Sequence, residues 1–496
     1  MITTILMKRL FHMTVFLFLV SLLPAQELLN IDRALEIAMQ NSPNMQQTAL
    51  SLESSRESLN AQRARLKSQF SLGLTPFEYS KRNRFDPTRS EWFLNEGYTS
   101  SGTFAIEQKV LPTDGVLKLS NTFGYQYNYS SSVSATESPE SKVFDNKLQL
   151  ELVQPLFTYN RTKVELEEVE LEYERSLLSY LLQKLSLEKS VKTNFFEVYS
   201  RQMQLNIDKE EQKNNEESYE IIKNKVEGGL LAVEELYQAE VNLATSRSSV
   251  YSSELNLQNS LDNFKVLIGM EITEELLIMA DIEVDSVGID EDIAIEHALA
   301  NRMELRQKQI LIEKSLFSLQ DAKTTNEFAG SVSAAFGLQG TNEQMDLLFN
   351  NPTQTPSIGV TFSIPIFDWG ERKSRIKAAE ANLKSTEIDL EVEKIDIVKN
   401  VRQVMRSITN LENQIDIQRK SVKNAELTYN INLERYRNGD LTSLDLGIYQ
   451  DQLSSKKLEL TQAIINYKLE LLELKIQTLY DFENQVSIIP DEIKAN

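Results

Sequence analysis

The sequence predicts a mainly α-helical fold that carries the strands of a membrane β-barrel. The fold is built twice from one succession of helix, strands and long helical hairpin. Neither Leu156 to Glu227 nor Glu371 to Asn438 contains a glycine or a proline, and roughly 70 helical residues reach about 100 Å. Immediately before each of these runs, apolar residues alternate with polar ones, which is typical of a strand with two different faces.

Composition limits the classes of function. The chain has 496 residues and a net charge of −21, from 52 basic and 73 acidic side chains, which argues against a nucleic-acid partner. It has no cysteine, so disulfides, thiolate zinc sites and cysteine nucleophiles are excluded. Glycine (16) and proline (11) are scarce, which suits long uninterrupted elements.

Residues 1–25 are predicted to be a signal peptide. Lys8 and Arg9 precede the apolar run Val15 to Leu23, and Ala25 offers a small residue at a cleavage position. The run is too short for a stable membrane anchor, and no later apolar run reaches the length of about 18 residues that a membrane helix needs. An exported chain of this kind would have to enter a membrane through strands of about ten residues.

Alternating segments predict strands at about 69–76 and 101–156 in the first copy and at about 330–340 and 357–367 in the second. At the start of the first segment, for example, Phe70 and Leu72 alternate with small residues. Such a strand also suits a water-soluble sheet packed on one face. The aromatic residues that gather at one end of "LKLSNTFGYQYNYS" are typical of a membrane interface instead.

The long runs predict two antiparallel helical hairpins, at 157–268 and 370–480. Each outgoing helix ends at a glycine-centred turn, "VEGGLL" or "RNGDLT", and apolar residues repeat along the helices with heptad spacing. We expect Gly228, Gly229 and Gly439 to end the helices in a backbone conformation that other residues adopt at a cost. A hairpin this long cannot bury its seam in a compact globule, so it must pack against copies of itself.

The repeat can be measured along the chain. Pro155 lies 74 residues before Gly229, and Pro365 lies 74 residues before Gly439. Proline suits both the end of a strand and the start of a helix, so Pro155 and Pro365 mark the expected strand-to-helix junctions. The predicted division is a first copy at 26–280, a second copy at 281–480 and a tail at 481–496.

Four stretches carry a resemblance to a known family. They are "ALEIAMQNSPNM", the junctions "QPLF" and "IPIFDWGERKSRIKAAEAN", and "ERYRNGDLTSLDLGIYQDQL" at the second tip. In this order, and duplicated, they resemble the TolC-type outer membrane factor family, the exit ducts of bacterial drug-efflux pumps and type I secretion systems. The resemblance implies a homotrimer in which strands from three chains close one β-barrel and the helices form one periplasmic tunnel.

The resemblance also implies a setting and partners. It places the chain in the outer membrane of a Gram-negative-type bacterium, in contact with lipid, a periplasmic adaptor protein and an inner-membrane pump, with no cofactor. The tips would contact the adaptor through Gly228, Gly229, Leu230, Asn438, Gly439, Asp440 and Leu441. Segment 77–142 departs from the family pattern, because it is long enough to add a hairpin to the usual four strands per chain. The sequence leaves open whether that hairpin joins the barrel or lies outside it.

The resemblance further implies a periplasmic gate. In the family, an acidic residue six positions after the tip glycine lies where three copies narrow the entrance, and here that residue is Asp445. Glu235 holds the equivalent position in the first copy, whereas Ile448 replaces a second aspartate of the family pattern. Clustered carboxylates would repel each other and attract cations. The helix dipole offers an ordinary alternative, which explains Asp440 better than Asp445.

Catalysis finds little support in the sequence. His297 stands in a helical stretch and is interpreted as a structural residue, and no glycine-rich phosphate loop or HExxH-like spacing occurs. No catalytic residue and no metal site is expected. The acidic run "VELEEVELEYE" (164–174) is interpreted as a solvated helix face, with a cation-attracting tunnel lining as the alternative.

Two other functions compete with a passive duct. A periplasmic adaptor also has a long helical hairpin, but it would carry one hairpin inside glycine-rich β-domains. A soluble coiled-coil scaffold would have no reason for alternating strands at the base of each hairpin. The transported substrate cannot be read from the sequence.

Overall fold

The structure is a computed structural model that describes residues 27–88, 90–132, 140–280, 282–284 and 286–490. The predicted signal peptide and the last residues of the predicted tail lie outside this range. The chain divides into two compact units. The sheet unit comprises the described residues within Ser51–Leu177 and Arg306–Glu391, and the hairpin unit comprises those within Met1–Leu50, Leu178–Leu305 and Val392–Asn496.

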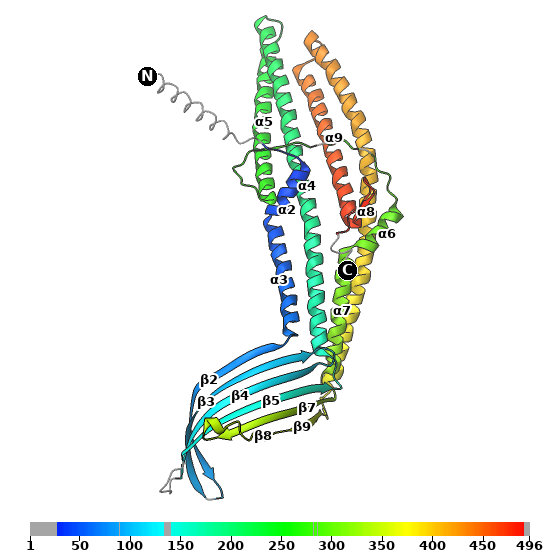
Figure 1. The fold of residues 1–496 in the computed structure, drawn as a ribbon. Coiled ribbons are helices and arrows are strands. Elements are labelled where there is room, and N and C mark those ends of the chain that lie inside the picture. Colours follow the sequence, from blue (N-terminus) through cyan, green and yellow to red (C-terminus); the bar gives the residue numbers. More distant parts are fainter. Residues whose placement is uncertain (1–26, 89, 133–139, 281, 285, 491–496) are drawn as a thin grey trace, which may run out of the picture. The chain divides into compact units, whose positions relative to one another are not determined.

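The sheet unit is built on one antiparallel sheet of seven strands (Figure 1). The strands are β2 (Gln69–Asp86), β3 (Glu91–Val110), β4 (Gly115–Ser132), β5 (Glu140–Leu156), β7 (Ala329–Asn342), β8 (Thr353–Gln354) and β9 (Ser357–Ser363). They pair in the order β2–β3–β4–β5–β7, and β7 pairs further with β8 and β9. A one-turn helix, η1 (Met345–Leu347), lies between β7 and β8. Among the described residues, β2 therefore forms one edge of an open sheet, and β8 and β9 form the other.

The additional segment of the first copy lies inside this sheet. Residues 77–142 form the rest of β2, all of β3 and β4 and the start of β5, and β3 and β4 are each paired on both sides. β2 is longer than expected because the chain passes Pro76 through a register shift between Thr75 and Glu78, and proline is tolerated at such a place on an edge strand. β9 ends at Ser363, earlier than expected, shortly before Pro365.

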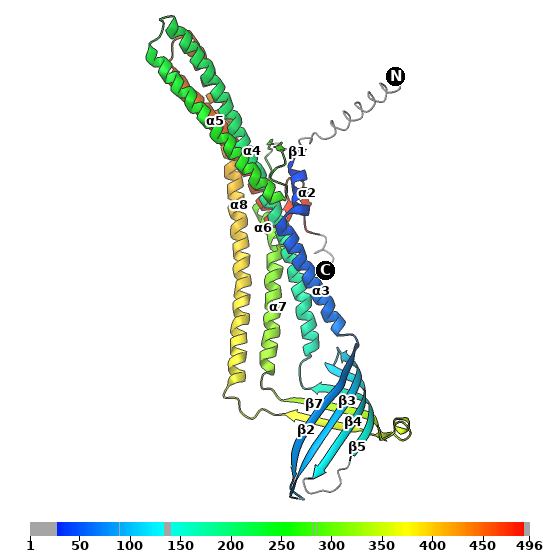
Figure 2. The ribbon, with the colours of Figure 1, turned by 90° about the vertical axis from the view of Figure 1, so that its left-hand side faces the viewer.

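Four helices contribute to the sheet unit. They are most of α3 (Pro43–Arg65) and α7 (Met303–Thr324) and the first parts of α4 (Arg161–Glu227) and α8 (Glu371–Asn438). Figure 2 shows α7 beside α8. The Arg372 guanidinium on α8 donates to the carbonyl oxygen of Lys323 at 2.9 Å, and the Thr386 hydroxyl lies 3.4 Å from that of Ser315.

The acidic run of α4 is explained by contacts between these helices. Glu170 pairs with Arg63 of α3 at 2.8 Å. Glu172 pairs with Lys314 of α7 at 2.9 Å, and Glu174 holds the Arg306 guanidinium with both carboxylate oxygens, at 2.6 and 2.8 Å. These three glutamates therefore join α4 to its neighbours, which the interpretation as a solvated face did not foresee.

The hairpin unit contains the remaining parts of α4 and α8, the two returning helices and several short elements. The returning helices are α5 (Val233–Ile268) and α9 (Ser443–Thr478), and the short helices are α2 (Ile31–Asn41) and α6 (Glu291–Asn301). β1 (Glu27–Leu29) pairs in parallel with β6 (Leu276–Ile278), and β10 (Tyr480–Asp481) pairs antiparallel with β11 (Val486–Ser487). One core gathers around Phe195, Phe264 and Ala38, and a second lies nearer the tips around Ile222 and Tyr436.

The predicted duplication of helix, strands and long hairpin is confirmed. Asn30 caps α2, and its side-chain oxygen accepts from the Arg33 N–H at 2.8 Å. Asp290 caps α6, and its carboxylate accepts from two N–H groups of the first turn at 2.8 and 3.1 Å. In both copies a second helix follows after a single residue, Ser42 or Arg302.

No helix within the described ranges combines the length and the apolar character that a membrane crossing requires.

Candidate functional site

The sheet has one apolar and one polar face, because residues that pair directly across antiparallel strands point to the same side. One row of paired residues runs across five strands and is apolar throughout: Phe70, Ile106, Leu119, Leu150 and Phe336. The next row along the strands points to the other side and is small or polar: Ser71, Ala105, Ser120, Gln149 and Gly337. The alternation seen in the sequence therefore separates two surfaces.

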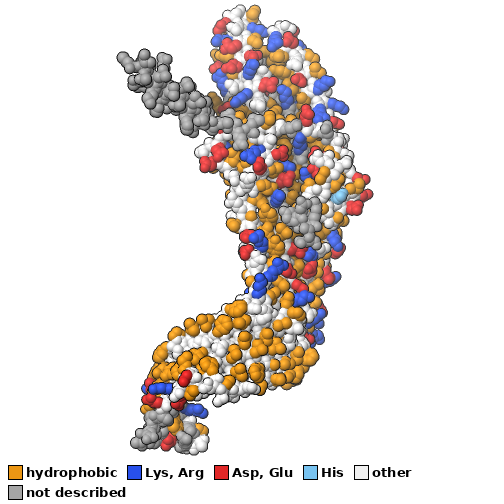
Figure 3. All heavy atoms as spheres, in the orientation of Figure 1, with side chains coloured by type: hydrophobic (Ala, Val, Ile, Leu, Met, Phe, Trp, Pro, Cys, Tyr) orange, Lys and Arg blue, Asp and Glu red, His pale blue; other side chains and the backbone are white. Residues whose placement is uncertain are grey.

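The apolar face is exposed in the single chain. Phe70 is 67% exposed and Leu150 is 46% exposed, and Figure 3 shows hydrophobic side chains gathered over the strands. The Asn121 and Asn146 side chains are a polar exception on this face, and they hydrogen-bond to each other at 3.0 Å. A continuous apolar surface of this size calls for a partner or for lipid.

Aromatic side chains border the apolar face at both ends. Away from the helices, Tyr98 stacks on Tyr127 at 4.8 Å, and Tyr125 contacts Phe144 at 4.9 Å between ring centroids. Next to the helices, the ring centroid of Phe328 lies 5.5 Å from that of Phe157 and 5.7 Å from that of Phe362. Two such girdles flank the apolar band of a membrane barrel.

The spacing of the two aromatic groups fits a bilayer. Phe144 and Phe157 are 13 positions apart in the chain, which is about 44 Å along a strand at about 3.4 Å per residue. A strand tilt of about 35–45° reduces this to roughly 31–36 Å along the membrane normal. The hydrocarbon core of a bilayer is about 30 Å thick. Leu150 lies midway between the two groups.

The two junction prolines lie where the strand ladders end. Pairing of β5 with β4 ends at Val153, so Pro155 has only Ser331 of β7 opposite it. Pro365 follows β9 by two positions. Neither proline begins a helix, which corrects that part of the expectation, because α4 starts at Arg161 and α8 at Glu371.

Carboxylates and an amide, rather than proline, begin the long helices. The Asn160 side-chain oxygen accepts from the Lys163 N–H at 2.9 Å, and Asp114, from the turn between β3 and β4, accepts from the Thr162 N–H at 3.1 Å. At α8, Asp368 accepts from the N–H groups of Arg372 and Gly370 at 3.0 and 2.9 Å. These two N–H groups hold the pKa of Asp368 below its ordinary value.

Both hairpin tips end their outgoing helix in the same way. Gly229 has φ +73° and Gly439 has φ +88°. The N–H of the following residue, Leu230 or Asp440, donates to the carbonyl five positions back, at 2.8 and 2.9 Å. This is the Schellman arrangement of a helix C-terminus. The expectation for Gly228 is wrong, because its φ is not positive, and only the second glycine of the pair adopts the unusual conformation.

The two tips begin their returning helices differently. At the second tip the Thr442 hydroxyl accepts from the Asp445 N–H at 3.2 Å and donates to the Asp445 carboxylate at 2.7 Å. Asp445 therefore has a capping role, whereas Asp440 lies before the helix, so the ordinary explanation fits Asp445 and not Asp440. At the first tip Ala232 precedes α5 and offers no side-chain cap.

The structure brings the first turns of the two returning helices together, but it does not pair the two candidate gate carboxylates. The Ser443 hydroxyl is buried and lies 3.4 Å from the Glu235 carboxylate, whereas Asp445, two positions further along α9, is exposed on a different face of the helix. The hairpins pack near their tips through Ile222, Tyr429 and Leu446, among other buried residues. Asn438 is the last residue of α8, and Leu441 packs at the edge of this core, whereas Leu230 is 78% exposed.

The hairpin unit contains a group of acidic residues that the sequence did not predict. Burial and the nearby carboxylates of Asp451 and Asp208 raise the pKa of Glu211 to about 6. Asp208 is buried and accepts from the Gln204 side chain at 2.8 Å and from the Ser253 hydroxyl. Only the i, i+3 spacing of Asp208 and Glu211 was visible in the sequence, because Asp451 comes from α9.

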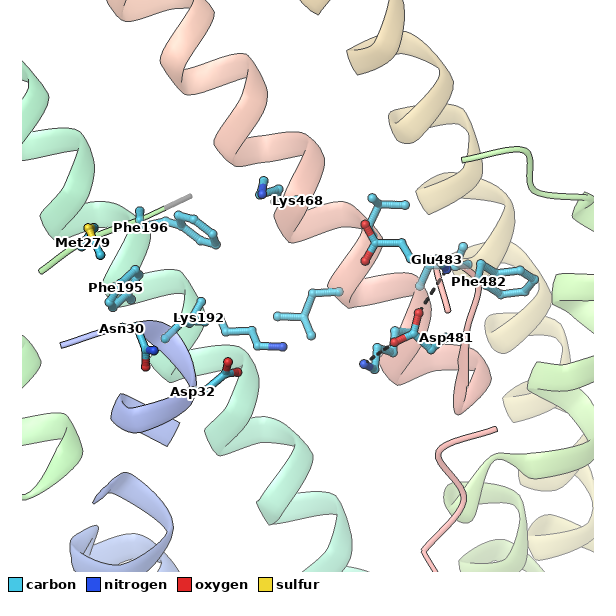
Figure 4. Close-up of a pocket in the computed structure, with 16 residues that line it drawn as sticks. Asn30, Asp32, Lys192, Phe195, Phe196, Met279, Lys468, Asp481, Phe482 and Glu483 are labelled. Atoms are coloured by element: carbon cyan, nitrogen blue, oxygen red, sulfur yellow. Dashed lines mark hydrogen bonds and ion pairs between the residues drawn. The ribbon is translucent and has the colours of Figure 1, made fainter. Parts of the chain in front are cut away.

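The hairpin unit also contains a pocket of about 720 Å³, whose lining residues are drawn in Figure 4. Phe195 and Phe196 of α4 and Lys468 of α9 line it, and Asp481 at its edge pairs with Lys475 at 2.6 Å. Among the described residues that line it there is no serine, threonine, cysteine or histidine.

His297 has a packing role. Its ring stacks on Tyr480 with the centroids 4.4 Å apart. Among the described residues, no group of three or more His, Asp and Glu side chains is arranged to hold a metal ion.

Comparison with known proteins finds similarity both in sequence and in fold. The family model described as outer membrane efflux protein matches residues 117–270 and 294–475. The chain is 21% identical over 260 residues to toxin and drug export protein A of Aggregatibacter actinomycetemcomitans, a match that covers 51% of this chain and 54% of that protein. It is 22% identical over 264 residues to outer membrane protein TolC of Escherichia coli, covering 50% and 52%.

These matches span about half the length of the two relatives. The fold is similar over a longer range. The crystal structure of the Campylobacter jejuni CmeC outer membrane channel superposes with a TM-score of 0.69 at 16% identity, covering 94% of this chain and 88% of that one. At this identity the likeness concerns the fold.

Proposed function

Since the chain belongs to the outer membrane efflux protein family, we propose that it is the passive exit duct of a tripartite efflux pump or type I secretion system. In this proposal it lies in the outer membrane of a Gram-negative-type bacterium. Three copies share one β-barrel and one helical tunnel, and a periplasmic adaptor and an inner-membrane pump are its partners.

One observation supports the proposal above the others. The sheet exposes an apolar face that is bordered at both ends by aromatic residues, on a chain that also carries two long helical hairpins. A sheet edge cannot remain unpaired in lipid, so a membrane sheet must close into a barrel. Seven strands are fewer than the eight of the smallest membrane barrels, so this sheet would close by joining other copies. A periplasmic adaptor or a soluble scaffold would have no use for such a face.

Membrane fractionation tests the proposal directly. We expect the protein in the outer membrane fraction, running on gels as a trimer that heating dissociates. A soluble periplasmic protein, or one recovered with the inner membrane, would overturn it. Loss of drug resistance or of secretion on deletion of the gene would then separate the two export routes.

The hairpin tips are proposed to contact the adaptor, and Asp445 and Glu235 to line the periplasmic entrance. The contact between Ser443 and Glu235 supports the gate, because it brings the first turns of α5 and α9 together within one chain. Three copies would bring six carboxylates to one axis. Such a cluster attracts multivalent cations, which would then block ion flow.

The capping role of Asp445 has to be separated from a role for its charge. Asp445→Asn keeps an oxygen that can accept from the Thr442 hydroxyl but removes the charge. We expect it to weaken block by multivalent cations added from the periplasmic side in planar bilayers. Thr442→Ala is the matched control, because it removes the cap and leaves the carboxylate. Unchanged block in Asp445→Asn combined with Glu235→Gln would place the constriction elsewhere.

A further inference from the structure

We infer that the six strands β2, β3, β4, β5, β7 and β9 of each chain enter the barrel wall, and that β9 of one copy pairs with β2 of the next. This inference rests on the proposed function, because it assumes three copies in a membrane. Six strands from each of three copies give 18 strands, against 12 for the usual four strands per chain. The additional hairpin β3–β4 is then part of the pore and not an appendage outside it.

The first support is the position of β3 and β4 within the sheet. On one side, β3 pairs with residues Gln69 to Asp86 of β2. On the other side, residues Phe93 to Val110 of β3 pair with β4. A hairpin outside the wall would leave β2 and β5 to pair with each other. Here they are separated by two complete ladders.

The second support is the chemistry of the hairpin's two faces. Phe104 and Ile106 of β3 and Leu119 of β4 point to the apolar side, in register with Leu72 and Phe70 of β2. On the polar side the Thr103 and Thr122 hydroxyls lie 3.0 Å apart. The hairpin also carries much of the outer aromatic group, through Tyr98, Tyr125 and Tyr127. A solvent-exposed appendage would need none of these features.

The third support is that β9 matches the part of the β2 edge next to the helices in length. β9 has seven residues, Ser357–Ser363. The regular part of β2 that precedes the register shift, Gln69 to Thr75, also has seven. Both segments lie at the ends of their strands next to the helices, since β2 follows α3 and β9 precedes α8. β2 leads away from the helices and β9 returns to them, so neighbouring copies would present antiparallel edges.

The fourth support is that the two edges match in side-chain pattern. With Gln69 opposite Ser363, the apolar pairs are Phe70 with Phe362, Leu72 with Val360, and Leu74 with Ile358. The remaining pairs are small or polar: Ser71 with Thr361, Gly73 with Gly359, and Thr75 with Ser357. A shift by one residue would place every apolar side chain of β2 opposite a small or polar residue.

The exposure of these residues fits an unfilled edge. Phe70, Leu72 and Leu74 are 65–67% exposed, and Ile358 is 82% exposed. Leu119 and Leu152, on the same face of inner strands, are 39% and 37% exposed. The side chains at the edges are more exposed than those on the inner strands because no neighbouring strand covers them.

The consequence is a wide exit. Barrel diameter grows roughly in proportion to strand number, so 18 strands give about 1.5 times the diameter of 12 and about twice the cross-section. Barrels of about 16–18 strands enclose an aqueous channel. The outer end of the duct would therefore pass bulkier cargo than a barrel of four strands per chain.

Cysteine cross-linking tests the edge pairing, and the natural chain has no cysteine to interfere. Oxidation of Ser71→Cys combined with Thr361→Cys should convert the outer-membrane protein into covalent dimers and trimers that a reductant dissolves. Ser71→Cys with Val360→Cys is the matched control, because the second cysteine points to the other face and should give no ladder. Ser333→Cys with Gly359→Cys, which pair within one chain, verifies that oxidation occurs in the membrane. Cross-linking within the chain without cross-linking between chains overturns the edge pairing.

Labelling of the additional hairpin tests its place in the wall. Single cysteines at Thr103 and Thr122 should react with a membrane-impermeant thiol reagent. A fluorophore on Phe104→Cys or Leu119→Cys should be quenched by brominated lipid. Equal reaction at all four positions without quenching, in a protein that is still an outer membrane trimer, would overturn the 18-stranded wall and leave the proposed function standing. Absence from the outer membrane would overturn the proposed function itself.

Discussion

The two copies of the repeat agree in their hairpins and differ at the two ends of those hairpins. The first copy contributes four long strands, whereas the second contributes two, together with the two-residue β8. Both tips end the outgoing helix on a glycine with positive φ, yet only the second tip has a side-chain cap on the returning helix. What both copies keep is the geometry that any long hairpin needs. The regions in which they differ are those where we place the barrel wall and the gate.

The largest effect is expected for charges placed on the apolar face. Leu150 of the first copy lies midway between the two aromatic groups, whereas Phe362 of the second lies at the end of β9 against Phe328. Leu150→Arg should destabilise the assembled protein by about 2–4 kcal/mol, and Phe362→Arg by about 0–1 kcal/mol. Thermal dissociation of the trimer measures the difference. Gln149→Arg, one position from Leu150 but on the polar face, should be tolerated, and an equal loss in all three variants would contradict the assignment of faces.

The next effect concerns the tip glycines, and it asks whether the two tips are equivalent. A left-handed conformation costs other residues about 1–2 kcal/mol. A Cβ at Gly229 or Gly439 would meet no atom within 4 Å, so the cost of Gly229→Val or Gly439→Val is conformational. We expect both to lower the thermal stability of the hairpins similarly, and Gly439→Val to abolish transport while the trimer still forms. Gly447→Ala, in the interior of α9 with equal space, should be neutral or slightly stabilising. Normal efflux by Gly439→Val would contradict the role of this tip.

A smaller effect should follow from removing the helix cap at the second tip and adding one at the first. Removing the hydroxyl in Thr442→Ala should cost about 1 kcal/mol, because the first turn of α9 loses its side-chain acceptor. The first tip has no such acceptor, so Ala232→Ser should stabilise α5 by about 0.5–1 kcal/mol. Hydrogen exchange of the first-turn amides would detect both changes. If Ala232→Ser leaves exchange in α5 unaltered, the two tips differ by more than their caps.

Local patterns in the sequence predicted most of the elements but few of the contacts between them. Absence of glycine and proline located α4 and α8, and alternation located β5, β7 and β9. The length of β2 was not predicted, because Pro76 is accommodated by a register shift on an edge strand. The place of the hairpin β3–β4 depends on which strands it pairs with, and no local pattern encodes that choice. Asp114 likewise begins α4 from a turn 47 residues earlier in the chain.

Glu211 gives the sharpest contrast in charge between the two hairpins. An offset of 210 residues relates the two copies, so Ser421 is its counterpart in α8. The Ser421 hydroxyl makes an ordinary contact with the Ile417 carbonyl at 2.9 Å. Glu211, by contrast, is half-buried near Asp451 and Asp208, which raises its pKa from 4.5 to about 6. At this position the first hairpin thus carries a carboxylate, whereas the second carries a hydroxyl.

The smallest expected effect is the pH dependence that Glu211 gives to stability. Because its folded-state pKa is the higher one, the folded protein binds more protons than the unfolded chain between pH 4.5 and about 6. Its contribution to stability is therefore fully present below pH 4.5 and is lost as the pH rises through about 6. The full shift corresponds to about 2 kcal/mol, which screening of this half-exposed group reduces to about 1 kcal/mol or less. The thermal stability of the wild type, relative to Glu211→Gln, should fall by this amount between pH 4.5 and 7. Glu210→Gln, which removes an exposed neighbour paired with Lys457, should retain the wild-type pH profile. An identical profile in wild type and Glu211→Gln would show that burial and the neighbouring carboxylates do not raise the pKa of Glu211 in the folded protein.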